Sequence, residues 1–167
     1  GATPKIWTSQ GGEATLIAYR NLLHQSGGIK IVQKHQRLLE TSVPYHITSD
    51  NKLLVHGGFD WHQPIENQSE YDLCWDRDLF FAASQWEEYN QVINPPAIVK
   101  NYSEVFIGHT TTSRTHPDLK PVHVSNVWNL DQGAGWEGKL TLMDIDTYEY
   151  YQSDLVKTLY PYVKGRK

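Results

Sequence analysis

The chain has 167 residues, of which 39% are hydrophobic and 12% aromatic, so it is long enough for one packed domain over residues 1–167 and too short for two. Its formal net charge is −4 and no basic run stands out, which argues against nucleic acid as a partner. No apolar run reaches the roughly 18 residues of a membrane span and no signal-peptide pattern opens the chain, so the sequence predicts a cytoplasmic protein without a membrane partner.

Two helices are predicted near the amino terminus, at residues 13–25 and 29–41, because apolar side chains recur there at helical spacing. The pair Gly27-Gly28 separates them. We interpret this helix pair as a cover over other elements and not as a site. One histidine, His35, falls in the apolar stripe of the second helix and is expected to be a buried or half-buried packing residue.

The next elements are strands. Residues 45–48 and 52–55 are short apolar runs on either side of a polar turn, which predicts an antiparallel hairpin. A helix is expected at 77–89. Several short strand-like runs between residues 121 and 151 then predict an antiparallel meander, so the expected fold class is α+β.

Two of the strand-like runs end in the same way. Residues 53–55 lead into His56 and residues 104–107 lead towards His109, and each histidine stands beside glycine. Glycine lets the backbone turn sharply at a strand end, where open α/β sheets place their ligands. Because the one cysteine, Cys74, rules out a cysteine-rich zinc site, a metal would be held by His, Asp, Asn or Glu. The pattern predicts a metal site that includes both histidines.

Several short motifs carry a resemblance to a known family. They are residues 10–15, His56-Gly57-Gly58, Trp75-Asp76-Arg77, Gly108-His109-Thr110, and a run from Asn129-Leu130-Asp131 to Gly138-Lys139-Leu140. In this order they resemble the carboxy-terminal half of calcineurin-like metallophosphoesterases. The type that they resemble most is the phage and bacterial serine/threonine protein phosphatase.

The resemblance implies that the chain is the carboxy-terminal part of a metallophosphoesterase α/β sandwich. His56 and His109 would be ligands of one of two divalent ions, which can be Mn, Fe, Zn or Ni because neutral imidazole suits all four. Arg77 would bind the substrate phosphate, since its guanidinium fork matches two phosphate oxygens. Asp131 would be either a carboxylate that orients a ligand histidine or a residue that stabilises the turn before Gly133.

Three further residues, His62, Arg114 and His116, lie in loops beside the two strand ends. They either line the substrate entrance or are simply solvated, as loop side chains often are. The sequence leaves both readings open.

The family's opening motifs do not precede His56 in this chain. These motifs are an Asp-x-His after the first strand, then Gly-Asp-x-x-Asp-Arg-Gly, then Gly-Asn-His followed by Glu or Asp. In the family they hold the rest of the metal pair and supply a general acid. We therefore expect a fragment of a metal-dependent phosphatase that alone binds metal weakly and is inactive. The absent strands would leave open edges and apolar faces, which predicts self-association.

The resemblance implies that the complete enzyme hydrolyses phosphate monoesters. Its partner would be a phosphorylated protein carrying phosphoserine or phosphothreonine, or a small phosphate ester, with a dinucleoside polyphosphate as the alternative substrate. The alternative from a different class is a non-catalytic binding module that kept the fold and lost the metal half. A parent reading frame that encodes the opening motifs would favour the enzyme.

Overall fold

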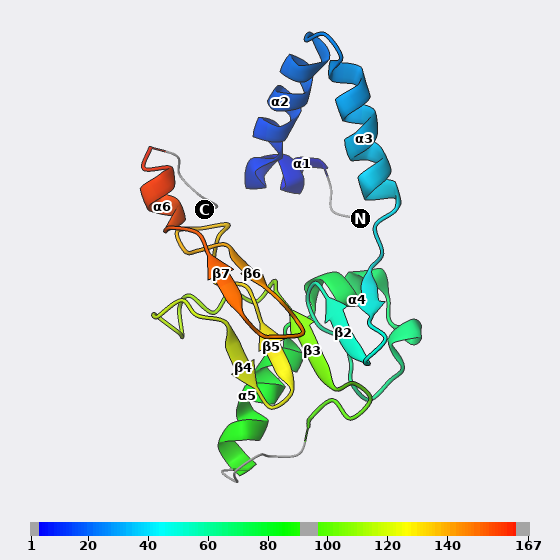
Figure 1. Ribbon diagram of the computed structural model, residues 1–167, viewed down its shortest axis with the longest axis vertical. Helices are drawn as coiled ribbons and strands as arrows, with labels where there is room; N and C mark the ends of the chain where they lie inside the picture. The colour runs from blue at the N-terminus through cyan, green and yellow to red at the C-terminus, as the bar shows by residue number, and fades with distance from the viewer. Residues whose placement is uncertain (1–3, 91–96, 163–167) are drawn as a thin grey trace. The chain divides into compact units, whose positions relative to one another are not determined.

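The computed structural model describes residues 4–90 and 97–162 (Figure 1). The sequence predicts one domain, and the described residues fall into two compact units, of which the first ends at Val43 and the second begins at Pro44. Within the described ranges, none of the helices is long and apolar enough to cross a bilayer.

The first unit is helical. Its elements are α1 (Pro4–Trp7), η1 (Thr8–Gly12), α2 (Glu13–Leu23) and α3 (Gly28–Glu40). The two predicted amino-terminal helices are therefore confirmed. Gly27 stands between them with φ of 78°, a left-handed conformation that costs glycine little.

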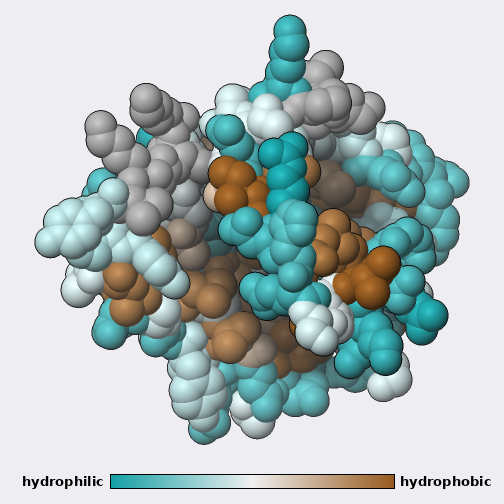
Figure 2. Space-filling model, turned by 90° about the horizontal axis from the view of Figure 1, so that it is seen from above, coloured by the Kyte–Doolittle hydropathy of each residue, from teal (hydrophilic) through white to brown (hydrophobic). Residues whose placement is uncertain are grey.

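The prediction that His35 is a buried or half-buried packing residue is wrong. The side chain is exposed, and its Nδ1 shares a hydrogen bond of 3.0 Å with the Tyr19 hydroxyl, so that it links α3 to α2 at the surface of the pair. Much of the apolar stripe is exposed as well, with Leu38 and Leu39 at 70% and 72%. The surface view likewise shows apolar side chains open to solvent among polar ones (Figure 2).

The second unit contains a mixed five-stranded sheet in the order β1-β2-β3-β5-β4. Parallel pairing joins β2 to β3 and β3 to β5, while the two edge strands pair antiparallel with their neighbours. The strands are β1 (Tyr45–Ile47), β2 (Lys52–Val55), β3 (Glu104–Ile107), β4 (Val122–Val124) and β5 (Val127–Asn129). The fold class α+β and the β1–β2 hairpin are both as predicted.

The remaining helices and strands lie outside this five-stranded sheet. They are η2 (Ile65–Asn67), α4 (Glu70–Trp75), α5 (Asp78–Asn90), the separate antiparallel pair β6 (Thr141–Met143) and β7 (Tyr150–Gln152), and α6 (Val156–Leu159). The predicted helix at 77–89 is confirmed as α5.

The prediction of one antiparallel meander over residues 121–151 is wrong. Its four strands form two antiparallel pairs in different sheets, and β5 lies parallel to β3. The reason is burial: Val127 and Asn129 of β5 are 0% exposed, so this strand needs a neighbour on each side within the sheet. Short strand signals read along the chain do not reveal such a distant partner.

A row of fully buried side chains crosses one face of the sheet. Leu53, Val105 and Val127 are register partners on β2, β3 and β5, and all are 0% exposed. Helix α5 lies against β4 and β5 (Figure 1) and contributes Leu79 and Ala83 to the same core. The apolar positions of α5 thus hold this helix on the sheet, and with it the residues at its amino-terminal end.

The opposite face carries an aromatic row. Phe106, Trp128 and His123 are register partners on neighbouring strands, and the Trp128 ring is stacked on both, at centroid distances of 6.5 Å and 4.2 Å. Tyr148, in the connection between β6 and β7, also stacks on Trp128 at 5.5 Å. This contact attaches the β6–β7 pair to the sheet.

Lys52 reinforces that attachment. Its ammonium lies 2.7 Å from Asp50 Oδ2 and 2.8 Å from Asp146 Oδ1, and Asp146 belongs to the same connection as Tyr148. The hydrogen bond to Asp146, together with the one to Asp50, raises the pKa of Lys52 above its ordinary value of 10.5. Because the native state binds the Lys52 proton more tightly than the unfolded chain does, the bonds of Lys52 to Asp50 and Asp146 stabilise the fold below pH 10.5. This stabilisation is lost as the pH rises further.

We therefore expect Lys52→Met to lower the melting temperature measured at neutral pH and low ionic strength, with a smaller difference from the original protein at high ionic strength, since salt screens the ion pairs. Lys120→Met, at an exposed position, is the matched control and should change the melting temperature little. Equal shifts for the two variants would contradict this role of Lys52.

Candidate functional site

The site forms where the parallel strands β2 and β3 end. His56 follows β2 directly, and His109 follows β3 after Gly108, whose backbone N–H donates to the His56 carbonyl oxygen at 2.9 Å. The two imidazole centroids are 5.3 Å apart. Since parallel strands end at the same edge of a sheet, the expectation that these histidines lie together is confirmed. His56 is exposed and His109 half-buried.

Two glycines bring the connection between α4 and α5 close to the end of β2. A β-carbon added at Gly57 would lie 2.9 Å from the Cys74 carbonyl carbon, and one at Gly58 would collide with the Asp76 carboxylate. The Gly57 N–H also donates to the Leu73 carbonyl oxygen at 2.7 Å. A side chain at Gly57 would force backbone to move, and one at Gly58 would displace the Asp76 carboxylate.

This close approach places Trp75 and Arg77 against His109. The Trp75 and His109 rings meet edge to face with centroids 5.1 Å apart, and Arg77 Nη2 lies 3.1 Å from His109 Nε2. Because a guanidinium has only donors, Nε2 must accept, which leaves the ring proton of a neutral imidazole on Nδ1. The predicted phosphate-binding arginine thus lies beside one of the two predicted ligands.

The backbone at His109 is strained. Its φ is 60°, in the left-handed region that a residue with a β-carbon rarely adopts. Left-handed residues other than glycine occur often at functional sites, where the surrounding structure holds them. Here the strain sets the direction in which the imidazole leaves β3.

We expect His109→Gly to be more stable than His109→Ala by about 1 kcal/mol, because both lose the imidazole and only alanine keeps the left-handed penalty. Chemical denaturation of the two variants measures the difference. Ile47→Gly and Ile47→Ala, in the edge strand β1, provide the control pair and should show the opposite order. Equal stability of the His109 pair would mean that the backbone relaxes when the ring is removed.

Asp76 lies beneath this arrangement. Its Oδ1 accepts the Leu79 N–H at 3.3 Å and so satisfies a donor in the first turn of α5. Burial raises the pKa of this carboxyl above its ordinary value of 3.8, and the hydrogen bonds from the backbone only partly oppose that effect. The native state therefore binds this proton more tightly than the unfolded chain does, and the protein loses stability as the pH rises above about 3.8 through the folded-state pKa.

The variant Asp76→Asn keeps an acceptor for Leu79 and removes the buried charge. We expect its melting temperature to exceed that of the original protein at neutral pH, with the gain shrinking as the pH falls towards 3.8. Asp118→Asn, in an exposed turn, controls for the loss of one negative charge. A pH-independent difference between Asp76→Asn and the original protein would refute the linkage.

The sequence left two roles open for Asp131, orienting a histidine or stabilising the turn before Gly133. The structure shows the contacts of the turn role. Asp131 Oδ1 accepts the Gly133 N–H at 2.9 Å, and the Asp131 N–H donates to Asn129 Oδ1 at 2.9 Å. Its β-carbon also lies near Gly108, 3.9 Å from where a β-carbon on that glycine would stand. The carboxylate is thus next to the site, and its action on a histidine stays a prediction.

The three loop residues have other surroundings. The His62 ring packs on Trp61 with centroids 5.1 Å apart, His116 Nδ1 shares a hydrogen bond of 3.0 Å with the Thr115 hydroxyl, and Arg114 is exposed. Their role at a substrate entrance stays a prediction.

One tripeptide after His56 has the letters of the family's opening motif, namely Asp60-Trp61-His62. Its carboxylate is engaged locally: Asp60 Oδ1 accepts the His62 N–H at 3.0 Å and Oδ2 accepts the Gln63 side-chain amide at 2.6 Å. These bonds lower the pKa of Asp60. The tripeptide forms a turn that the aspartate stabilises.

The donor set fits part of one metal site. Two imidazoles on one tetrahedral ion, with metal–nitrogen distances of about 2.0–2.1 Å, have ring centres roughly 5 Å apart, which agrees with the observed separation of 5.3 Å. Within residues 4–90 and 97–162, no group of three or more His, Cys, Asp or Glu side chains is placed to hold a metal ion.

No family model matches the chain, and no curated protein matches it. The resemblance to metallophosphoesterases therefore depends on the sequence motifs alone. The sequence did not predict the contact of Trp75 with His109, although Trp75 stands directly before Asp76-Arg77 in the motif.

Proposed function

We propose that this chain carries one part of a two-metal phosphoesterase centre, in which His56 and His109 are ligands of one ion and Arg77 binds the substrate phosphate. The observation that carries the proposal is the convergence of these three side chains at the ends of two parallel strands. On this proposal the sheet and α5 form part of the family's α/β sandwich.

Each side chain has a task that its geometry supports. A neutral imidazole suits Mn, Fe, Zn or Ni as a ligand, and the Trp75 ring packs against the His109 ring at a right angle and restricts its rotation. Arg77 has five N–H donors, and its bond to His109 uses one of them, so the guanidinium can offer a fork to two phosphate oxygens. A bound metal pair would supply an activated water and neutralise charge on the phosphoryl oxygens.

His109 Nε2 cannot bind a metal and accept from Arg77 at the same time, because it has one lone pair. Metal binding through this atom requires Arg77 to turn away, which also frees the whole guanidinium for substrate. The structure thus supports a site in which the arginine changes partners.

Two imidazoles are too few for turnover. In-line displacement of an alcohol needs carboxylate ligands that bridge two ions and an acid for the leaving group. We propose that a polypeptide segment with the family's opening motifs supplies them, and that phosphoserine or phosphothreonine in a protein, or a small phosphate ester, is the substrate. A non-catalytic module remains the second candidate, because within the described residues the predicted ligands number two.

The test is to express the chain together with the amino-terminal half of a phage-type serine/threonine phosphatase and to assay a phosphate monoester with manganese. We expect no turnover by the chain alone and measurable turnover by the pair. Turnover by the chain alone that His109→Ala abolishes would overturn the need for the second half. No turnover by the pair, with manganese binding that His56→Ala leaves unchanged, would favour the non-catalytic module.

In the active pair, Arg77→Ala should lower kcat/KM, and the decrease should correspond to a loss of about 1.5–3 kcal/mol of transition-state stabilisation. The reason is that the substitution removes a charged hydrogen-bonding group from the phosphate. Arg114→Ala is the matched control because this arginine lies exposed in a loop, and its kcat/KM should change little. Equal losses for the two variants would refute the assignment of Arg77.

A further inference from the structure

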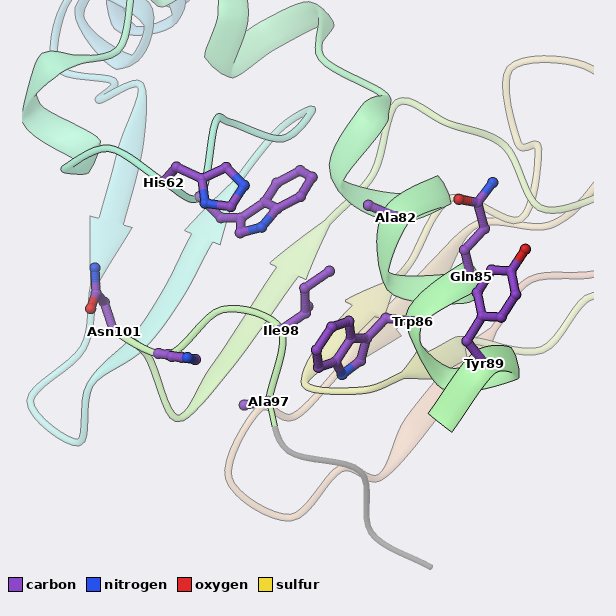
Figure 3. Close-up of a pocket in the computed structure, with 10 residues that line it drawn as sticks. His62, Ala82, Gln85, Trp86, Tyr89, Ala97, Ile98 and Asn101 are labelled. Carbon is purple, nitrogen blue, oxygen red and sulfur yellow. The ribbon is translucent and has the colours of Figure 1, made fainter. Parts of the chain in front are cut away.

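A pocket of about 900 Å³ lies beside the second half of α5 (Figure 3). One wall is that helix, through Gln85, Trp86 and Tyr89, and the opposite side carries His62 and Asn101. The volume is within the range of sites that hold a small organic ligand.

The pocket is separate from the site at His56 and His109. Arg77 stands just before α5, whereas Gln85 and Tyr89 come 8 and 12 residues later. At about 1.5 Å of rise per residue, this places them roughly 12–18 Å further along the helix. His62 is also one of the residues predicted for the substrate entrance, but the inference drawn from the pocket does not depend on the proposed phosphoesterase function.

The lining is rich in aromatic rings. Trp61 and Trp86 both contribute, together with Tyr89, while Ile98 adds an aliphatic surface between them. Aromatic walls favour a planar ring, because ring pairs gain energy beyond the area that they bury.

The charge of the lining is positive. Among the described lining residues, Lys100 is the one Lys, Arg, Asp or Glu, and in the part of the chain that the structure describes this lysine makes no ion pair. The other polar groups of the described lining are the amides of Gln85 and Asn101, the His62 imidazole and the Tyr89 hydroxyl. In a protein of net charge −4, a lysine without a carboxylate partner at the edge of an aromatic pocket favours an anionic ligand.

We propose that this pocket binds a small planar aromatic anion, with its ring against the Trp61 and Trp86 indoles and its negative group on Lys100.

The experiment compares two probes of similar shape, 2-naphthoate and neutral 2-naphthylmethanol, by calorimetric titration of the full chain. We expect saturable binding of both, with naphthoate bound about fivefold more tightly because of the charged hydrogen bond to Lys100. Lys100→Gln should remove this preference, whereas Lys120→Gln, at an exposed position outside the pocket, should keep it. Equal affinities for the two probes, or no saturable binding of either, would overturn the proposal.

The aromatic wall is tested with a matched pair of tryptophans. Trp86 and Trp136 are 37% and 38% exposed, and only Trp86 lines the pocket. Trp86→Ala should weaken both probes about fivefold through the lost ring contact, and Trp136→Ala should not. Ala82→Phe, which fills the pocket from α5 without removing a core side chain, should weaken both probes as well. Unchanged binding in Ala82→Phe would place the probes elsewhere and refute the proposal.

Discussion

The approach of the α4–α5 connection to the end of β2 is the constraint on which the rest of the site depends. Gly57 and Gly58 have no side chain where the backbone at Cys74 and the carboxylate of Asp76 come closest. A side chain at Gly57 would displace the backbone at the end of α4, and one at Gly58 would displace the Asp76 carboxylate, which accepts from the N–H of the buried Leu79. Either change would disturb the contacts of Trp75 and Arg77 with His109. Core packing and site geometry thus depend on the same close approach of Gly57 and Gly58 to Cys74 and Asp76.

Parallel pairing of β2 with β3 supplies the second condition. The strands are short, and most of their side chains are buried. A buried strand has a single favourable register, since a shift by one residue would exchange the two faces. The positions of His56 and His109 relative to each other follow from that register, so the rigid part of the fold determines the spacing of the two rings.

The sequence predicts those parts of the fold that depend on neighbours along the chain. Helical spacing in α2, α3 and α5 and the polar turn of the β1–β2 hairpin are local signals, and all of them were confirmed. The histidines were found because each strand end carries its own signal beside glycine. The prediction of a meander was wrong because the partner of β5 lies about twenty residues earlier in the chain, in β3. The prediction that His35 is buried or half-buried was wrong because an apolar stripe does not say whether another element covers it. The aromatic pocket could not be predicted, since its walls come from segments with no common motif.

The hydrogen bond between Arg77 and His109 has a thermodynamic consequence. A side chain that occupies an atom needed by a second ligand acts as a competitor built into the chain, and it lowers the apparent affinity for that ligand. On the proposed function, a phosphate that draws Arg77 away would expose the histidine nitrogen, and a metal on that nitrogen would release the arginine. By linkage the two effects are equal in size, so metal and substrate would each strengthen the binding of the other.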